Sequence, residues 1–130
     1  MSLKLGEYRI DPERPRGEAL RIGAVRYLPR GVTREERKRY FDVWMPALSP
    51  APELLKAVQA APDGKQKEAA WKALVAGYRK QIAGDAAARQ TIALIAAMAE
   101  REPIEIGCYC DVPTCHRFTL ERLIREAADE

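Results

Sequence analysis

The sequence predicts an α/β domain in which a small, mostly parallel sheet is flanked by helices. A chain of 130 residues suits one domain and is too short for two ordinary ones. Two apolar segments, Leu20–Leu28 and Ile104–Cys110, have strand character and are separated by a long region of helical pattern. Strands joined by such long crossovers pair in parallel. The hydrophobic fraction of 47% and the charged fraction of 32% are both too high for a disordered chain.

The first third of the chain contains two of the expected strands. Leu3 to Ile10 is expected to form a short strand, and a turn-rich stretch follows it. Leu20–Leu28 is apolar without strict alternation, which is typical of a strand covered on both faces. Thr33 with Glu36 three positions later forms a capping box, so we expect a short helix over 34–40.

The middle of the chain is expected to be helical. Residues 41–49 have no clear pattern, and Ser49 followed by Pro50 then predicts a helix N-terminus, ended by the turn at 62–64. Apolar residues at helical spacing predict a second helix over 71–82. Its expected end is at Gly84.

Two further helices complete the expected order. Asp85 is a suitable N-cap for a third helix, whose apolar residues occur on several faces. We therefore expect that helix to be the most buried, and its apolar surface leaves room for a dimer, although the sequence does not determine the oligomeric state. The last helix is expected to begin near Thr114. No internal repeat or low-complexity linker is present, so residues 1–130 are expected to form a single domain.

Composition also bears on location and partners. No apolar run reaches the length of a membrane span, and residues 1–20 lack the pattern of a signal peptide, so we expect a cytoplasmic protein without a membrane partner.

Residues 1–40 carry eleven Lys/Arg and six Asp/Glu, a surplus of five positive charges. Arginine binds phosphate in a planar, bidentate manner. A phosphorylated small molecule or a nucleic acid is therefore a candidate partner, and an ordinary solvated surface is the alternative.

All three cysteines and the only histidine lie within nine residues, in the segment CYCDVPTCH from Cys108 to His116. This segment is expected to connect the C-terminal end of a strand to the N-terminus of a helix, where open α/β sheets bind ligands. A second segment, Arg26–Gly31, follows the other main strand. If these two strands are parallel neighbours, both segments open on the same edge of the sheet, and Arg26, Arg30 and Arg117 converge there.

The order of several motifs carries a family resemblance. RYLPRGV at 26–32, FDVWMPALSPAPELL at 41–55, WKALVAGYR at 71–79 and the final CYC and CHR motifs follow one another along the chain. In this order the chain resembles domain-of-unknown-function family 488 from about residue 3 to 127. The resemblance implies a compact α/β domain and no established activity.

Three interpretations of the cysteine segment remain open. In the first, a phosphate or nucleotide binds at the sheet edge. Its ligand-binding residues are Arg26, Arg30, Gly31 and Arg117, and its candidates for chemistry are Cys110, Cys115 and His116. A cysteine near a helix N-terminus beside a cation can be a thiolate. Cys110 precedes Arg117 by seven positions rather than the six of a cysteine-phosphatase loop, so we exclude that reaction. This interpretation requires no cofactor.

The second interpretation is a zinc site in a structural or nucleic-acid interaction module. Its four ligands would be Cys108, Cys110, Cys115 and His116, which supply the Cys₃His set of zinc proteins. The C-x-C spacing and the adjacency of Cys115 and His116 are unusual for one tetrahedral ion.

The third interpretation is structural. In this interpretation the cysteines are buried core residues, and the histidine forms a hydrogen bond with a nearby carbonyl.

Other residues are assigned mainly to packing. Trp44 and Trp71 are expected to be core anchors. Asp111 is expected to pair with Arg117, with orientation of His116 as the alternative. A reversible disulfide between Cys110 and Cys115 is compatible with each interpretation.

Overall fold

The computed structural model describes residues 3–110 and 115–129. The expectations at Asp111 and at Thr114 lie outside these residues. In chain order the helices and strands are β1 (Leu5–Arg9), β2 (Leu20–Gly23), η1 (Glu36–Arg39), β3 (Val43–Trp44), η2 (Pro46–Leu48), α1 (Pro52–Ala60), α2 (Lys65–Ala83), α3 (Ala86–Ala99), β4 (Ile104–Cys108) and α4 (His116–Ala128).

A four-stranded sheet with the order β1-β4-β2-β3 forms the centre of the described chain, and all its pairs are parallel. This confirms the predicted α/β fold with a parallel sheet flanked by helices. β4 lies between β1 and β2, so Ile106 is paired with Glu7 on one side and with Ile22 on the other. Ile22 and Ile106 are almost fully buried, as expected for strands in the interior of a parallel sheet.

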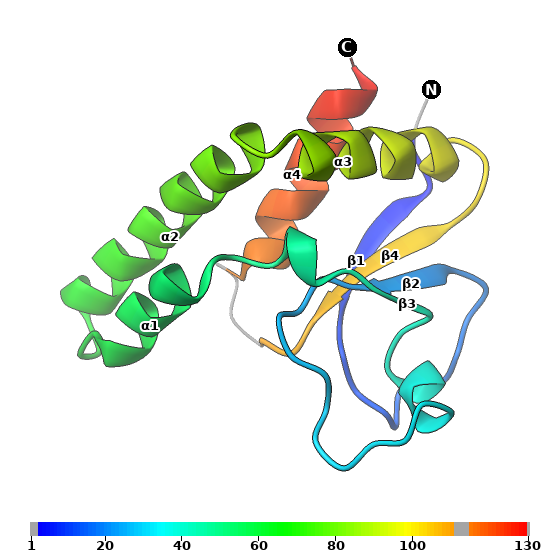
Figure 1. The fold of residues 1–130 in the computed structure, drawn as a ribbon, viewed down its shortest axis with the longest axis horizontal. Helices are drawn as coiled ribbons and strands as arrows, with labels where there is room; N and C mark the ends of the chain where they lie inside the picture. The colour runs from blue at the N-terminus through cyan, green and yellow to red at the C-terminus, as the bar shows by residue number, and fades with distance from the viewer. Residues whose placement is uncertain (1–2, 111–114, 130) are drawn as a thin grey trace.

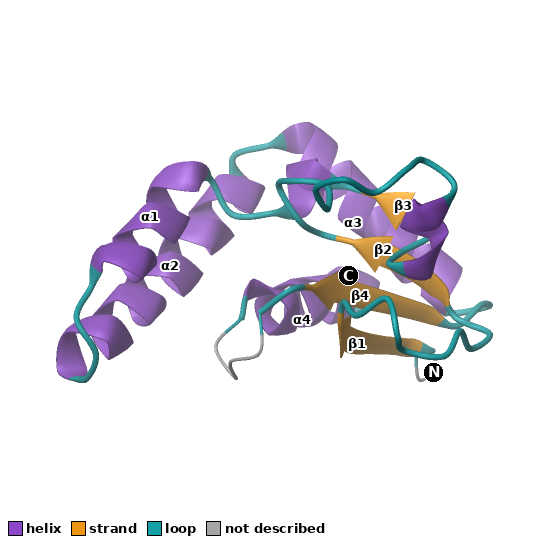
Figure 2. Cartoon of the chain, turned by 90° about the horizontal axis from the view of Figure 1, so that it is seen from below, coloured by secondary structure: helices purple, strands orange, loops and turns teal. Residues whose placement is uncertain are grey.

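Helices cover one face of the sheet (Figure 1). α3 and α4 contact β4, α4 also contacts β1, and α2 packs on α3 and α4. The main core lies between this face and the helices, and it includes Ile22, Ile106, Ile95 and Leu120. The α1–α2 pair extends away from the sheet in both Figure 1 and Figure 2.

Loops cover the opposite face. Alternation along the strands places Arg21, Glu105 and Tyr8 on this side. Tyr8 lies over Gly107, where a Cβ would come within 2.5 Å of the tyrosine ring. The Tyr8 hydroxyl donates to the carbonyl of Tyr40 at 2.7 Å, which links the sheet to the segment that contains η1. No helix in the described ranges is long and apolar enough to cross a membrane.

Several element boundaries differ from the predictions. β2 ends at Gly23 instead of Leu28, and β4 ends at Cys108 instead of Cys110, because the pairing between these strands stops at Gly23 and Gly107. α1 begins at Pro52 with Ala51 as its N-cap rather than at Ser49. The Ser49 hydroxyl instead donates to the carbonyl of Pro46 at 2.7 Å.

Two predictions about burial differ from the structure. α3 has five buried residues, but α4 has five as well, so α3 is not more buried than α4. Trp44 is exposed at the end of β3 and donates its indole N–H to the carbonyl of Val25 at 2.7 Å, so it is not a core anchor. Asp85 does cap α3 as predicted, since its carboxylate accepts from the amides of Ala87 and Ala88.

Candidate functional site

The ends of β2 and β4 bring the two predicted segments together. Gly23 and Gly107 are paired, and the amide of Ala24 donates to the carbonyl of Gly107 at 3.0 Å. Residues after Gly23 and after Gly107 therefore leave the sheet side by side. This is the juxtaposition that the parallel arrangement predicts.

The N-terminus of α4 adds the buried histidine to these strand ends. His116 is the first residue of α4, and its Nε2 lies 2.7 Å from the carbonyl oxygen of Ala24. Because a carbonyl only accepts, Nε2 carries the proton of this hydrogen bond and Nδ1 has a free lone pair. Burial lowers the pKa of His116 below its usual value, so the ring is neutral at pH 7.

Nδ1 of His116 faces two cysteines. It lies 3.8 Å from Sγ of Cys108 and 3.8 Å from Sγ of Cys115, and all three side chains are buried. The three ligand atoms lie within 4.8 Å of one another. We call Cys108, Cys110, Cys115 and His116 the Cys/His cluster.

Cys110 is the half-buried member of the Cys/His cluster. Hydrogen bonds from the thiols of Cys108 and Cys115 lower the pKa of Cys110 far below its usual value, although burial opposes this. The same contact with Cys110 raises the pKa of the Cys108 thiol to about 11. These directions favour Cys110 as the member of the cluster that deprotonates most readily.

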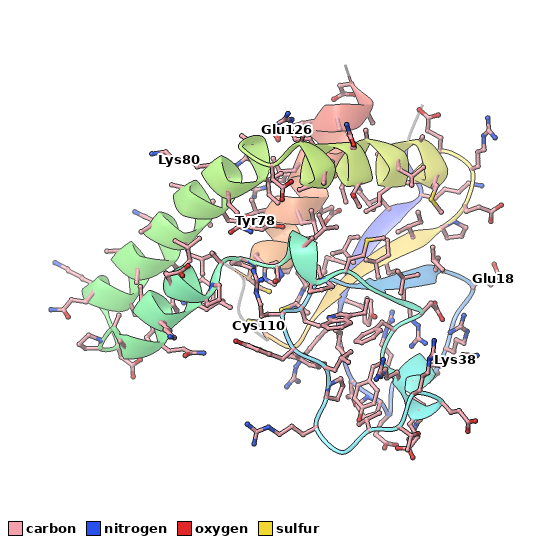
Figure 3. All side chains as sticks on the ribbon, viewed as in Figure 1. Glu18, Lys38, Tyr78, Lys80, Cys110 and Glu126 are labelled. Atoms are coloured by element: carbon pink, nitrogen blue, oxygen red, sulfur yellow. The ribbon has the colours of Figure 1, made fainter. Side chains whose placement is uncertain are left out.

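Tyr78 supports the cluster from α2. Its ring packs edge-on against His116, with centroids 5.6 Å apart, and its hydroxyl donates to the carbonyl of Leu48 at 2.6 Å. Figure 3 shows Tyr78 on the side of α2 that faces α4, and Cys110 beyond the end of β4. The sequence places Tyr78 on the apolar face of a helix, and no signal in the sequence connects it to His116.

The three predicted arginines have different surroundings. Arg117 is buried, its Nε lies 2.5 Å from a carboxylate oxygen of Glu7, and it also donates to the carbonyl of Cys110. Its carboxylate partner among the described residues is thus on β1, and the predicted Asp111 pairing involves a residue outside them. Arg30 is exposed, and Gly31 beside it is exposed with a φ of 70°.

Arg26 lies at the cluster. It donates to the carbonyls of Ser49 and Pro50, at 3.3 and 3.0 Å. Its Nε is buried and has no hydrogen-bond partner. No carboxylate in the described part of the chain forms an ion pair with Arg26.

A cavity of about 190 Å³ joins Arg26 to the cluster. We call it the Cys/His pocket. Cys108, Cys110 and His116 line it together with Arg26, and two exposed rings, Tyr27 and Tyr109, lie at the same cavity. Neither Arg30 nor Arg117 lines it, so the structure brings one of the three predicted arginines into this pocket.

Comparisons with known proteins identify a family. The family profile DUF488-N3a, described as the active DUF488-N3 subclade, matches residues 5–128. No curated protein and no solved structure matches the chain.

Proposed function

The chain belongs to domain-of-unknown-function family 488 (DUF488), and we propose that its Cys/His pocket binds a small anionic ligand through Arg26, beside the Cys110 thiolate. The observation that supports this most directly is the state of Arg26. Among the described residues its hydrogen-bond acceptors are two backbone carbonyls, and its buried Nε has none. A phosphate or carboxylate oxygen in the pocket would supply that acceptor.

Arg26 and Arg117 differ in their partners. Glu7 forms an ion pair with Arg117, whereas no described carboxylate contacts Arg26. Leaving a buried donor unsatisfied costs about 1–3 kcal/mol, so binding an anion at Arg26 would recover part of that cost.

The size of the pocket limits the ligand. Pockets for drug-sized ligands measure roughly 300–1,000 Å³, and this one has about 190 Å³. It suits a phosphoryl or carboxylate group and not a whole nucleotide. Tyr27 and Tyr109 offer exposed rings at the pocket, on which a planar remainder of the ligand, such as a base, could stack.

Chemistry at this pocket would use the Cys110 thiolate. Cys110 lines the pocket, and a thiolate is the reactive form of cysteine. The description of the matching subclade as active supports a reactive centre. Arg26 would offset the repulsion between the thiolate and a bound anion.

The binding test uses Arg26→Gln with Arg30→Gln as its matched control. Inorganic phosphate and a nucleoside monophosphate are titrated by calorimetry against both variants and the unchanged chain. We expect Arg26→Gln to weaken binding at least tenfold, and Arg30→Gln to retain it, because Arg30 is exposed and does not line the pocket. Equal affinities in all three proteins would refute the proposal.

A zinc ion is the second candidate occupant of the Cys/His cluster, and the geometry of His116 favours it. Zn–S bonds of 2.3 Å and Zn–N bonds of about 2.05 Å place tetrahedral ligands about 3.8 Å (S to S) and 3.6 Å (S to N) apart. Nδ1 of His116 lies 3.8 Å from both sulfurs, which is close to this requirement despite the adjacency of Cys115 and His116. The bond from Nε2 to the Ala24 carbonyl is the kind of contact that orients metal-bound histidines.

Metal content and reactive thiols, measured on protein purified without a metal-affinity tag or chelator, separate the two candidates. About one zinc per chain, with thiols that react only after chelation, would assign the Cys/His cluster to metal. No metal and one fast-reacting thiol would assign it to a free thiolate, and Cys110→Ser should then remove the fast reaction. Three equally slow thiols without metal would contradict both zinc and the Cys110 thiolate and favour purely structural cysteines; anion binding at Arg26 is decided by the calorimetry.

A further inference from the structure

A second pocket lies on the face of the sheet that the loops cover, and its lining is strongly basic. It has a volume of about 620 Å³ and is lined by Pro12, Arg14, Arg16, Arg21, Lys38, Arg39 and Asp42. We call it the basic pocket. It shares no lining residue with the Cys/His pocket, and Figure 3 shows Lys38 on η1 well away from Cys110.

Three segments that are separate in the sequence form the basic pocket. Arg14 and Arg16 come from the loop between β1 and β2, Arg21 comes from β2, and Lys38 and Arg39 come from η1. A continuous run of charge on one helix is usually a solvated face. Here the fold instead gathers five cations around one concavity.

The acidic partners only partly neutralise these cations. Glu105 binds Arg14 through two hydrogen bonds of 3.1 Å, and Asp42 accepts from Arg16. The remaining acidic contact, between Glu13 and Arg39, is long at 3.5 Å and exposed, so it contributes little. Five cations against these three carboxylates leave a surplus of two positive charges.

Arg21 is the buried base of the basic pocket. It is only 2% exposed, and its guanidinium donates to the carbonyls of Lys38 and Arg39. Its Nε lies 3.6 Å from Asp42, beyond hydrogen-bonding distance, and has no hydrogen-bond partner. Asp42 is shared with Arg16, so one carboxylate serves two guanidinium groups.

Lys38 and Arg39 supply accessible charge at the edge. Both side chains are exposed, and no acceptor in the described residues binds the ammonium of Lys38. Five cations lining a pocket of about 620 Å³ suit a ligand with several phosphates better than a single phosphate ion. Among the described residues no aromatic ring lines the basic pocket, so these residues offer no surface on which to stack a base.

From this arrangement we propose that the basic pocket binds the phosphodiester backbone of a nucleic-acid strand, through charge and without reading its sequence. The surplus of five positive charges in residues 1–40 would attract such a strand. The proposal does not depend on the function of the Cys/His pocket, and Arg26→Gln should leave strand binding unchanged.

The experiment measures the binding of a labelled single-stranded oligonucleotide at a series of salt concentrations. Each phosphate neutralised on a single strand contributes about −0.7 to the slope of log K against log salt. Replacing both exposed cations, in Lys38→Gln/Arg39→Gln, should therefore reduce the slope by about 1.4. The matched control, Lys72→Gln/Lys80→Gln, removes two exposed lysines from α2 and should leave the slope unchanged.

Three comparison ligands test the proposed chemistry. An abasic strand of the same length should bind within about twofold of the normal strand, because the pocket is expected to contact only the backbone. Tripolyphosphate should displace the strand, because it also carries several phosphate charges, and inorganic phosphate should compete poorly. The proposal is overturned if both double variants lose affinity equally, if the strand does not bind at low salt, or if inorganic phosphate displaces the strand as effectively as tripolyphosphate does.

Discussion

Three arginines of this chain illustrate how surroundings decide the role of one residue type. Arg117 pairs with Glu7, and Arg21, buried beneath the basic pocket, lies 3.6 Å from Asp42. Arg26 has two backbone carbonyls and no carboxylate as partners among the described residues. The side chain is the same in each case, and the sequence does not reveal these differences in partners.

Arg117→Met should destabilise the protein without a specific effect on ligand binding. Removing one partner of a buried ion pair costs about 3–5 kcal/mol, and the partial exposure of Glu7 should place this variant at the lower end, about 3 kcal/mol. Urea denaturation measures the loss. Arg30→Gln, which alters an exposed side chain, is the control and should stay within about 0.5 kcal/mol of the parent. A loss of less than about 0.5 kcal/mol in Arg117→Met would show that the ion pair with Glu7 does not stabilise the folded protein.

Asp42 should make stability depend on acid pH. Burial raises the pKa of Asp42, and hydrogen bonds from Arg16 and from the Arg21 amide lower it. The lowering is the larger effect, so the pKa of Asp42 lies below its usual value. A depressed carboxyl pKa stabilises the folded state above the unfolded pKa of about 3.9, and this contribution is lost as the pH falls through the folded pKa.

The difference in unfolding free energy between the parent and Asp42→Asn should therefore be constant near neutral pH and should shrink below about pH 4. Urea denaturation at a series of pH values measures it. Asp63→Asn is the control, because the Asp63 side chain is fully exposed and should show no such change. If the difference in unfolding free energy between the parent and Asp42→Asn stays constant down to pH 3, the pKa of Asp42 is not lowered in the folded state.

At the scale of elements, the sheet depends on glycines that allow aromatic rings to lie on its loop-covered face. A Cβ at Gly107 would come within 2.5 Å of the Tyr8 ring, and one at Gly23 would collide with Phe41. The Tyr8 ring cannot move freely, because its hydroxyl is bonded to the Tyr40 carbonyl. These contacts keep the η1 segment, and with it the basic pocket, against the sheet.

Gly107→Ala should cost about 1–3 kcal/mol, the usual range for overpacking. Thermal or urea unfolding measures the cost. In a Tyr8→Ser background, which lacks the ring, the same Gly107→Ala substitution should cost less. Gly17→Ala is a suitable control, because a Cβ at that position meets nothing within 4 Å. Equal stabilities of Gly107→Ala and Gly17→Ala would show that the Tyr8 ring moves aside without lowering the free energy of unfolding.

Local patterns predicted most of the elements. The Asp85 cap, the end of α2 at Gly84 and the paired strands β2 and β4 are all confirmed, because each follows from residues close in sequence or from an apolar run. β3 was missed, since it is a two-residue strand that exists only through its pairing with β2. The end of β2 was predicted five residues too late, because apolar residues beyond Gly23 are buried without belonging to the sheet.

The candidate site was predictable in part. The Cys/His cluster and its position at the strand ends followed from a rare local concentration of residues and from the parallel arrangement. The partners that define its chemistry come from elsewhere in the chain: the Ala24 carbonyl for His116, Tyr78 from α2, and Glu7 for Arg117. Such contacts depend on side-chain placement in three dimensions, and no pattern in one sequence encodes them.

At the scale of the whole molecule, helices pack on one face of the sheet and charged loops cover the other. The Cys/His pocket lies at the carboxyl ends of β2 and β4, and the basic pocket lies over the loop-covered face. The two proposed ligands therefore bind at separate surfaces. Anion binding and strand binding can be tested independently in one intact protein.

If the Cys/His cluster binds zinc, the ion should stabilise the whole fold. At a free concentration 100 times the Kd, a ligand specific for the folded state adds about 2.7 kcal/mol to the free energy of unfolding. Thermal unfolding with and without zinc measures this, with a chelator to reverse it. His116→Gln should abolish the zinc-dependent increase whatever its own stability, and an equal increase in that variant would place the ion elsewhere.

The position of β4 has a consequence for biosynthesis. Among the described strands β4 is translated last, yet it separates β1 from β2 in the sheet. At about 5–20 residues per second, a ribosome needs roughly 4–16 s to progress from the end of β2 to the start of β4, and during that time β1 and β2 have no strand between them. The nascent chain thus carries unpaired strand edges during that interval, and the Cys/His cluster is assembled only after β4 and the start of α4 have been translated.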